Sequence, residues 1–348
     1  MKFLYSLTIV WGILCVIMYL IEGLNPEKFW IFSISSLIIP ISFIINFFLI
    51  GFWVLIHWRY AWLPLVIILT GYFQLNKLVS FKSLNDAEQC SNDKAIKVMS
   101  FNLYGLKNLK DTLGLNFQKN KSQFLTFLRK NNPDVLCVQE NNLFSDDVIS
   151  KSDLFPYVHY ILNHGAAIYS KFPMLDQGNI DFGTNTNSCL WADILIEGRR
   201  IRTYSMHLQS NSITKQVGLL KEDDDTQNIE KLNVVKQMLR KFRRMSVRRA
   251  KQADLVRDHA VKSLYPVILA GDFNDTPFSY VYKVLTEGRN DSFLKRGNGF
   301  GATLVSILPG LRIDYVLADA KKIEFCSHKV LQTEFSDHNP VVVTAFLK

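Results

Sequence analysis

Two long runs without a charged residue lie near the N-terminus and limit the fold more than any other feature. Phe3–Ile21 has 19 uncharged residues and Phe29–Ile56 has 28. A helix of about 20 apolar residues crosses the roughly 30 Å hydrocarbon core of a bilayer, so each run predicts a membrane span. A third run, Tyr60–Asn76, has 17 uncharged residues but is interrupted by proline and glycine. We therefore predict a membrane anchor over residues 1–80 with two or three transmembrane helices.

The number of spans decides on which side of the membrane the rest of the chain lies. Lysine and arginine usually mark the cytoplasmic side, but here the two sides nearly tie. One side has Lys2 and Arg59, and the other has Lys28, Lys77 and Lys82. We favour three spans, which make a multi-pass membrane protein with an extracytoplasmic main domain; two spans would leave that domain in the cytoplasm. A cleaved signal peptide is the alternative for the first run, although the second run would still need a membrane.

The composition excludes several classes of protein. The chain is 48% hydrophobic and has 25 phenylalanines, which excludes an intrinsically disordered protein. Five cysteines at irregular spacings exclude a zinc ribbon, a CxxC redox site and a disulfide-stapled mini-domain. The sequence has no Walker A loop, dinucleotide-binding fingerprint or G-x-S-x-G elbow. With the apolar runs added, a fully cytosolic globular protein and a fibrous repeat are also excluded.

The remainder of the chain is predicted to be a polar linker over residues 81–93 and one large domain over residues 94–348. We predict helices at 119–130 and 228–262, and strands at 95–102, 134–139, 165–169, 189–196, 200–207, 266–270, 312–317 and 340–346. Gly198 is expected to turn the fourth and fifth of these strands into a hairpin. Many strands with a few long helices between them are typical of an α+β fold or a layered sandwich.

Polar side chains that suit metal binding or proton transfer lie at or near the ends of six of these apolar segments. They are Asn102, Glu140, His207, Asp272, Asn274, Asp314, Asp337 and His338. A charge at the end of a buried strand costs several kcal/mol unless it is paired or bound to a cation. Any single member has an ordinary alternative as a turn former, a solvated loop acid, a core histidine or an ion-pair partner. Their recurrence predicts one shared polar site.

The types of these side chains indicate which metal would bind. Carboxylate and amide oxygens suit Mg²⁺ or Mn²⁺ rather than zinc. The oxygen donors are Asn102, Glu140, Asp272, Asn274 and Asp337. The two histidines are then free for proton and charge transfer. This mixture suits phosphoryl chemistry, in which a metal neutralises the phosphate, a carboxylate activates water and a cationic histidine stabilises the transition state.

Six motifs in order carry a resemblance to a known family. They are SFNL at 100–103, VQEN at 138–141, MHLQS at 206–210, GDFNDTP at 271–277, RIDYVL at 312–317 and SDHNPV at 336–341. Over residues 97–346 the sequence resembles the endonuclease/exonuclease/phosphatase superfamily, which includes DNase-type nucleases, apurinic endonucleases, neutral sphingomyelinases and inositol-polyphosphate 5-phosphatases. The resemblance implies a DNase-like four-layer α/β/β/α sandwich and Mg²⁺-dependent hydrolysis of phosphate esters.

The same resemblance implies roles for the metal-site residues. Glu140 would be the main metal ligand, and Asn102 would lie in the same metal site or hold a ligand of it. Asp337 would bind a metal or help to position the attacking water. Whether one metal or two take part stays open at this point.

For the catalytic and substrate-binding residues, the resemblance implies that Asp272 orients or deprotonates the attacking water. Asn274 would hold the phosphate, and His207 would donate to one of its non-bridging oxygens. Asp314 would form a hydrogen bond with His338, and His338 would stabilise the transition state.

Together these features predict a membrane-anchored, Mg²⁺-dependent phosphoesterase, a nuclease or another phosphodiesterase. The alternatives are a sphingomyelinase-like lipid-headgroup phosphodiesterase, an inositol-phosphate phosphatase and an inert tethered binding domain, although the last would need one of the six motifs to be broken. Residues 231–262 contain 11 basic residues and two acids, so this helix is a surface for anionic lipid, a surface for nucleic acid or a solvated face. No protein partner can be inferred.

Overall fold

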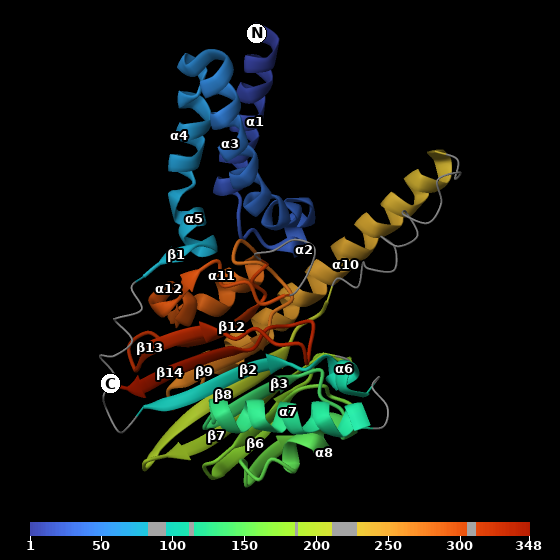
Figure 1. The fold of residues 1–348 in the computed structure, drawn as a ribbon, viewed down its shortest axis with the longest axis vertical. Coiled ribbons are helices and arrows are strands. Elements are labelled where there is room, and N and C mark those ends of the chain that lie inside the picture. Colours follow the sequence, from blue (N-terminus) through green and yellow to red (C-terminus); the bar gives the residue numbers. More distant parts are fainter. Residues whose placement is uncertain (83–94, 111–114, 185–186, 211–227, 305–310) are drawn as a thin grey trace. The chain divides into compact units, whose positions relative to one another are not determined.

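A computed structural model of the chain describes residues 1–82, 95–110, 115–184, 187–210, 228–304 and 311–348 (Figure 1). Most of the predicted linker at 81–93 lies outside these residues. The chain divides into two units. The first contains Met1–Leu75, Gln209–Asp254 and Phe278–Lys283, and the second contains Asn76–Leu208, Leu255–Pro277 and Val284–Lys348.

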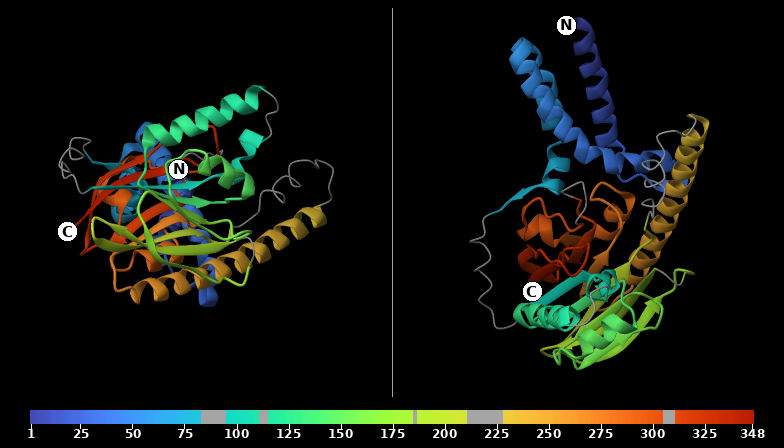
Figure 2. Two further views of the ribbon diagram at one scale, coloured as in Figure 1. Left: turned by 90° about the horizontal axis from the view of Figure 1, so that it is seen from below. Right: turned by 45° about the vertical axis from the view of Figure 1, so that its right-hand side comes forward.

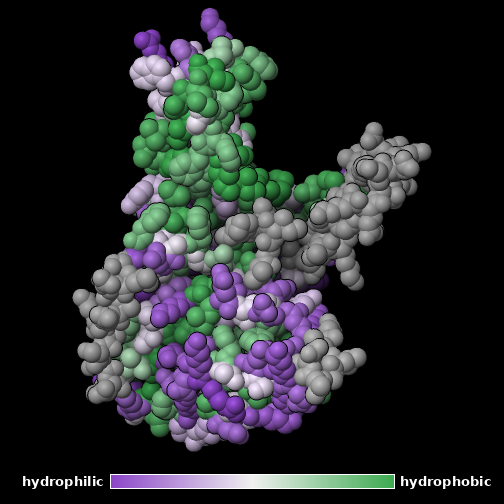
Figure 3. Space-filling view, viewed as in Figure 1, coloured by the Kyte–Doolittle hydropathy of each residue, from purple (hydrophilic) through white to green (hydrophobic). Residues whose placement is uncertain are grey.

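The first unit contains the apolar N-terminal helices. In order they are α1 (Lys2–Leu20), α2 (Pro26–Phe29), η1 (Trp30–Ile34), α3 (Ser35–His57), η2 (Trp58–Tyr60), α4 (Trp62–Thr70) and α5 (Tyr72–Leu78), the last of which continues into the second unit. Two stretches, Lys2–Leu20 and Pro26–Tyr60, are long and apolar enough to cross a membrane. Only 22% and 28% of their apolar windows are buried, which is unlike the core helix of a soluble protein. Figure 3 shows the apolar surface over these helices.

The third predicted span differs from the other two because it is divided into α4 and α5 at Gly71. Neither part alone is long enough to cross a bilayer. Polar contacts join the two long helices. The Trp53 indole N–H of α3 donates to the Thr8 hydroxyl of α1 at 3.1 Å, and the Tyr19 and Ser42 hydroxyls lie 3.0 Å apart. These hydrogen bonds fix α1 against α3.

The second unit is built on two six-stranded sheets, with a small two-stranded sheet beside them. One sheet has the order β13 (Ile323–Val330), β14 (Val341–Leu347), β2 (Ile96–Asn102), β3 (Val135–Gln139), β5 (Ala167–Ser170), β4 (Tyr157–Tyr160). The other has the order β10 (Arg289–Asp291), β12 (Asp314–Asp319), β9 (Val267–Asp272), β8 (Arg199–His207), β7 (Ser188–Ile196), β6 (Met174–Ile180). The small sheet pairs β1 (Ser80–Phe81) with β11 (Asn298–Gly299).

Both large sheets are mixed, because β2 is parallel to β3 and β8 is parallel to β9, whereas the other neighbours are antiparallel. Their inner faces enclose a core of fully buried aliphatic side chains, including Val98, Ile168, Leu190 and Val316. Burial of such side chains is the main force that holds the two sheets together.

Helices cover the outer faces of the sheets (Figure 2). On one side lie η4 (Tyr104–Leu106), α6 (Lys107–Lys110), α7 (Leu115–Asn131) and α8 (Leu143–Ser150). Phe124 and Leu128 of α7 are fully buried in a second apolar cluster against β2, β3 and β5. On the other side, the last turns of α10 (Asn228–Val261) contact β8, where the Tyr204 hydroxyl lies 2.8 Å from His259 Nδ1. The remaining helices are α11 (Tyr280–Thr286) and α12 (Ser292–Arg296). The structure therefore confirms the predicted α/β/β/α sandwich.

Most of the predicted elements agree with the structure to within a few residues. The expected hairpin is confirmed, since β7 and β8 pair antiparallel across the turn at Gly198. Strands β4, β6, β10 and β13 were not predicted. Strand β6 is an exposed edge strand, and its sequence, MLDQGNI, lacks the apolar alternation that marks a strand.

Candidate active site

One edge of the two sheets collects all of the predicted site residues. The parallel strands β2 and β3 end at Asn102 and just before Glu140, and the parallel strands β8 and β9 end at His207 and Asp272. Carboxyl ends of parallel strands lie at the same sheet edge. In the pairing of β8 with β9, His207 lies directly opposite Asp272.

Two antiparallel strands begin at the same edge. Asp314, the first residue of β12, pairs opposite Asp272, the last residue of β9. Strand β14 starts at Val341, which pairs with Ser100 of β2, so Asp337 and His338 come just before this strand at the same edge. Chain direction thus explains why residues more than two hundred positions apart meet.

Asp272 lies at the centre of the site and is 1% exposed. The Asn102 side-chain amide donates to its Oδ2 at 3.0 Å, and the Asn274 backbone N–H donates to its Oδ1 at 2.7 Å. The Nε2 atoms of His207 and His338 lie 3.7 Å and 3.9 Å from the same Oδ2. Burial, and then the nearby charge of Asp314, raise the pKa of Asp272, while the two histidines oppose that rise.

His338 and Asp314 form a buried pair with 2.8 Å between Nδ1 and Oδ2. Burial alone would lower the pKa of His338, but Asp314, followed by Asp272 and Asp337, outweighs it and raises this pKa to about 10. The ring therefore carries a positive charge at neutral pH, with Nε2 turned toward Asp272. The second Asp314 oxygen, Oδ1, is buried without a hydrogen-bond partner among the described residues.

Glu140 is a partly open carboxylate of the site, with 36% of its side chain exposed. Its Oε1 lies 3.4 Å from the Asn102 amide nitrogen and 3.8 Å from His207 Nε2. Asp337 is close enough to interact electrostatically with Glu140. Burial raises the pKa of Asp337, His338 opposes the rise, and Glu140 adds to it.

Three residues at this edge have unusual backbone geometry. Glu140 and Asn274 both have φ of +52°, a left-handed conformation that is rare for residues other than glycine. Gly271 has φ of +147°, and a Cβ there would lie 2.0 Å from the Met206 carbonyl oxygen. Glycine at 271 therefore allows β9 to approach β8 closely just before Asp272. Strained backbone of this kind is often found where side chains are held for chemistry.

All eight predicted residues thus lie in one connected network, but the structure adds detail to two of them. The Asn102 side-chain oxygen accepts the Tyr104 backbone N–H at 3.0 Å, so its amide N–H₂ points toward Glu140 and Asp272. This orientation suits a residue that holds acidic ligands in place. The Asn274 amide donates to the Leu208 carbonyl at 2.9 Å, which ties the two loops together.

Two residues with supporting roles were missed in the sequence. The Ser336 hydroxyl donates to the Asn102 carbonyl at 2.7 Å and accepts the His338 backbone N–H at 3.1 Å, so it holds the segment before β14 against the end of β2 in the same sheet. The Thr303 hydroxyl accepts the backbone N–H groups of both Ile313 and Asp314 at 3.1 Å. Ser336 stands in the SDHNPV motif, which signalled it, whereas Thr303 lies outside the six motifs, in the loop that precedes RIDYVL.

The donor set of the site fits a divalent cation. Burial and the neighbouring charge of Glu140 both raise the pKa of Asp337, and a bound cation would favour the ionised carboxylate. Asp272, Asp314 and His338 form a second group, whose ligand atoms all lie within 4.8 Å of one another. In this second group, Asp314 and His338 are already bonded to each other. The oxygen-rich first group is therefore the better metal site.

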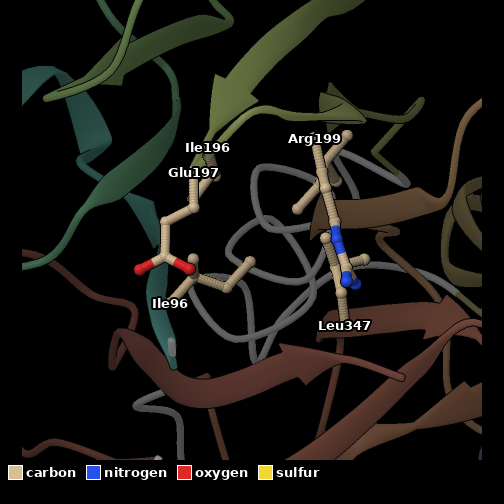
Figure 4. Close-up of a pocket in the computed structure, with 6 residues that line it drawn as sticks. Ile96, Ile196, Glu197, Arg199 and Leu347 are labelled. Atoms are coloured by element: carbon tan, nitrogen blue, oxygen red, sulfur yellow. The ribbon is translucent and has the colours of Figure 1, made fainter. Parts of the chain in front are cut away.

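The pocket drawn in Figure 4 is separate from this site. The small pocket in Figure 4 has a volume of about 50 Å³ and is lined by Ile96, Ile196, Glu197, Arg199 and Leu347 with Ile201. Arg199 begins β8 and His207 ends it. The pocket therefore lies at the opposite end of the strands from the candidate site.

Comparisons with known proteins identify the family and the fold. Residues 99–338 match the model of the endonuclease/exonuclease/phosphatase family, and residues 1–78 match a domain of unknown function, DUF8431. No curated protein matches the sequence.

Among solved structures, humanized D. rerio TDP2 is similar with 18% identity and a TM-score of 0.53, covering 72% of this chain and 98% of that one. An endonuclease/exonuclease/phosphatase from Bacteroides vulgatus has 16% identity and a TM-score of 0.54, covering 74% of this chain and 100% of that one. The human Nocturnin catalytic domain with bound sulfate has 17% identity and a TM-score of 0.52, covering 73% and 95%. These likenesses show the fold. With the family match over residues 99–338 and the assembled carboxylate and histidine network, they show that the chain belongs to the endonuclease/exonuclease/phosphatase family of metal-dependent phosphoesterases.

Proposed function

We propose that this protein is a membrane-anchored, Mg²⁺-dependent phosphodiesterase that cleaves its substrate by in-line attack of water on phosphorus, with nucleic acid as the favoured substrate. The observation that carries this proposal is the position of Asp272, a buried carboxylate with a raised pKa held between two histidines. Such a carboxylate is a better proton acceptor than an exposed one at neutral pH.

In this mechanism Asp272 accepts a proton from the attacking water. Both of its oxygens are held by hydrogen bonds from Asn102 and Asn274, so it keeps its orientation as the water approaches. The water oxygen forms a bond to phosphorus while the bond to the leaving oxygen breaks. His338, held cationic by Asp314, stabilises the negative charge on the phosphoryl oxygens.

His207 also stabilises the negative charge on the phosphoryl oxygens. Its Nε2 faces both Asp272 and Glu140, and its Nδ1 is buried without a partner among the described residues. We assign to it a hydrogen bond to a non-bridging phosphate oxygen. Asn274 would bind the phosphate alongside it.

Glu140 and Asp337 would hold Mg²⁺, or Mn²⁺ in its place. When bound, the cation would neutralise charge on the phosphate. Asn102 would orient Glu140 through its amide N–H₂, because its oxygen already accepts the Tyr104 N–H. This arrangement explains why an amide and not a third carboxylate stands at the end of β2.

The choice of substrate rests on charge and on one similar protein. The chain has a formal net charge of +9, which favours binding to a polyanion. A structure of D. rerio TDP2 contains a single-stranded DNA product, and it is similar with a TM-score of 0.52 and 17% identity. The membrane helices favour the second candidate, a phosphodiester in a lipid headgroup.

The helices of the first unit support membrane anchoring. Their surfaces expose many large apolar side chains, among them Phe48, Leu55 and Leu69. The hydrogen bonds from Trp53 to Thr8 and between Tyr19 and Ser42 favour retention of α1 in a bundle over its removal as a signal peptide.

Contacts within the first unit support three crossings. The segment between α1 and α3 contacts later parts of the chain: the Gly23 N–H donates to the Phe278 carbonyl at 3.1 Å, and the Lys251 ammonium lies 3.3 Å from Glu27. The described residues after Leu78 contain no further candidate span. These contacts favour an even number of crossings between them, and in our proposal α3 and α4–α5 together provide that number. The main domain then lies on the side opposite the N-terminus.

A disulfide supports an extracytoplasmic position for that domain. Cys326 of β13 is disulfide-bonded, whereas Cys137 and Cys189 are buried free thiols. Disulfides persist in oxidising compartments outside the cytoplasm. A lumenal or periplasmic main domain is the arrangement that satisfies both the disulfide and three crossings.

The test is hydrolysis by the full chain reconstituted in lipid nanodiscs. Single- and double-stranded DNA, RNA, sphingomyelin and inositol phosphates would be supplied with Mg²⁺, with and without EDTA. We expect cleavage of nucleic acid that EDTA abolishes and Mg²⁺ restores. Full activity in EDTA, or no cleavage of any phosphate ester, would overturn the proposal. Cleavage of sphingomyelin alone would show that the substrate is a lipid headgroup and not nucleic acid.

A further inference from the structure

Helix α10 presents four cations along one exposed face. Lys236, Arg240, Arg244 and Arg248 are spaced four residues apart, so they lie in a row, and all four are exposed. We name this row the cationic stripe. Figure 1 shows α10 as one long helix.

An apolar edge runs beside the cationic stripe. Val235 and Leu239 each precede a member of the stripe by one position, and they are 42% and 39% exposed. A nucleic acid would be bound by the cations alone and would gain little from these two side chains. Cations next to exposed aliphatic groups are the pattern of a helix that lies on an anionic membrane surface.

The side of α10 away from the stripe is buried from Phe242 onward, and Val235 and Leu239 continue that side into its exposed part. The stripe itself is not a part of the core left uncovered. Phe242, Met245 and Ala250 are buried. The buried Arg249 donates to the Gln209 carbonyl at 2.6 Å, and Gln252 accepts the Gln209 N–H at 2.8 Å. The helix is thus held through this side, and the stripe faces away from it.

Two contacts connect α10 to the segment that joins the first two spans. The Arg243 guanidinium lies 5.7 Å from the centre of the Trp30 ring, and Lys251 pairs with Glu27. Tryptophan and lysine close to the end of a span are typical of the membrane–water interface. Arg244 and Arg248 fall between these two contact points along the helix.

We propose that the cationic stripe binds the anionic lipid headgroups of the membrane that the protein's own helices cross, with Val235 and Leu239 entering the headgroup layer. The proposal rests on the membrane anchoring proposed above. Each cation at such a surface strengthens binding by roughly fivefold. The anchor already confines α10 to the membrane, so even this moderate gain holds the helix down.

The experiment uses the full chain in nanodiscs made either of phosphatidylcholine alone or with about one third phosphatidylglycerol. An environment-sensitive dye is attached at Leu239→Cys; Cys15, Cys137 and Cys189 are buried and Cys326 is disulfide-bonded, so they are protected from labelling. We expect a blue shift and quenching by brominated lipid in phosphatidylglycerol discs, both reversed by high salt.

The test variant replaces all four stripe cations by glutamine, and we expect it to lose the phosphatidylglycerol response. The matched control removes four exposed cations of the other unit, as Lys119→Gln, Lys130→Gln, Lys321→Gln and Lys322→Gln, and should keep the response. Equal spectra in the two lipids would overturn the proposal.

A dye response to single-stranded DNA in phosphatidylcholine discs, without a response to phosphatidylglycerol, would also overturn it and make the stripe a nucleic-acid surface. Extraction with alkaline carbonate separates this failure from a failure of the anchor. Release of the chain by carbonate would refute membrane anchoring itself, whereas retention without any lipid-dependent response would refute the stripe alone.

Discussion

Replacing Asp314 by asparagine removes the negative charge that keeps His338 cationic, while the size of the side chain stays the same. The two residues are buried and lie 2.8 Å apart. Burial opposes the charge on the ring, yet the pKa of His338 is raised to about 10, and Asp314 is the largest of the groups that raise it. A rise from about 6.5 to about 10 corresponds to roughly 5 kcal/mol in favour of the imidazolium.

In the Asp314→Asn variant, burial becomes the dominant influence on His338, and its pKa should fall below neutrality. A neutral ring cannot stabilise charge that develops on the phosphoryl oxygens. Loss of one such group usually lowers the rate by about 10²–10³-fold. We therefore expect a decrease of this size in kcat at neutral pH, with substrate affinity changed much less.

The assay is kcat for the variant beside Asp193→Asn as a control. Asp193 is also buried and also pairs with a cation, at 2.6 Å from Arg202, but it lies in the middle of β7 away from the site. Nitrogen NMR of labelled histidine rings reports whether His338 is charged. An unchanged rate, or a His338 ring that remains an imidazolium in the variant, would refute the assignment.

Three further predictions follow from the geometry. Asp272→Asn should lower the rate by about 10³-fold, because it removes the proposed proton acceptor. The same change should raise the melting temperature, because it removes a buried charge. A fully active variant would refute the assignment of Asp272 as the base. Gly271→Ala should destabilise the fold by more than about 4 kcal/mol, because its Cβ would lie 2.0 Å from the Met206 carbonyl oxygen, and thermal unfolding with near-normal stability would contradict the close approach. Burial lowers the pKa of His328 to about 4, so the neutral ring is favoured in the folded state and the free energy of unfolding should fall by roughly 3 kcal/mol between about pH 6.5 and pH 4. His328→Phe should remove that acid sensitivity, as measured by melting temperature against pH.

The polar residues of the site could be predicted because each follows or begins an apolar run. Asn102, Glu140, His207 and Asp272 stand where buried strands end, and this local context is visible in the sequence. Their neighbourhood in space could also be anticipated, because parallel strands end at a common edge.

The supporting contacts could not be predicted in the same way. Thr303 acts on Asp314 from a loop, and its neighbour Leu304 forms a bridge with His338. Such pairing depends on the tertiary fold and leaves no periodic pattern. The orientation of Asn102 depends likewise on the Tyr104 backbone. The sequence therefore predicted which residues meet at the site, but their orientations depend on the tertiary fold.

For the apolar N-terminal helices, the sequence was informative about composition but not about local geometry. Composition identified α1 and α3 well, but the break at Gly71 is a matter of local backbone geometry. The contact between Gly23 and Phe278, which bears on the number of crossings, joins residues far apart in the sequence. The tied lysine and arginine counts could not supply that information.

The proposed catalytic groups are divided between the two sheets: Asn102, Glu140 and His338 lie in or next to strands of one, and His207 and Asp272 belong to the other. A slip of one sheet over the other by a single residue would separate base from imidazolium without breaking any strand. The rate of catalysis should therefore depend strongly on the register of one sheet relative to the other. Substitutions in the apolar layer between the sheets should reduce catalysis before they reduce folding.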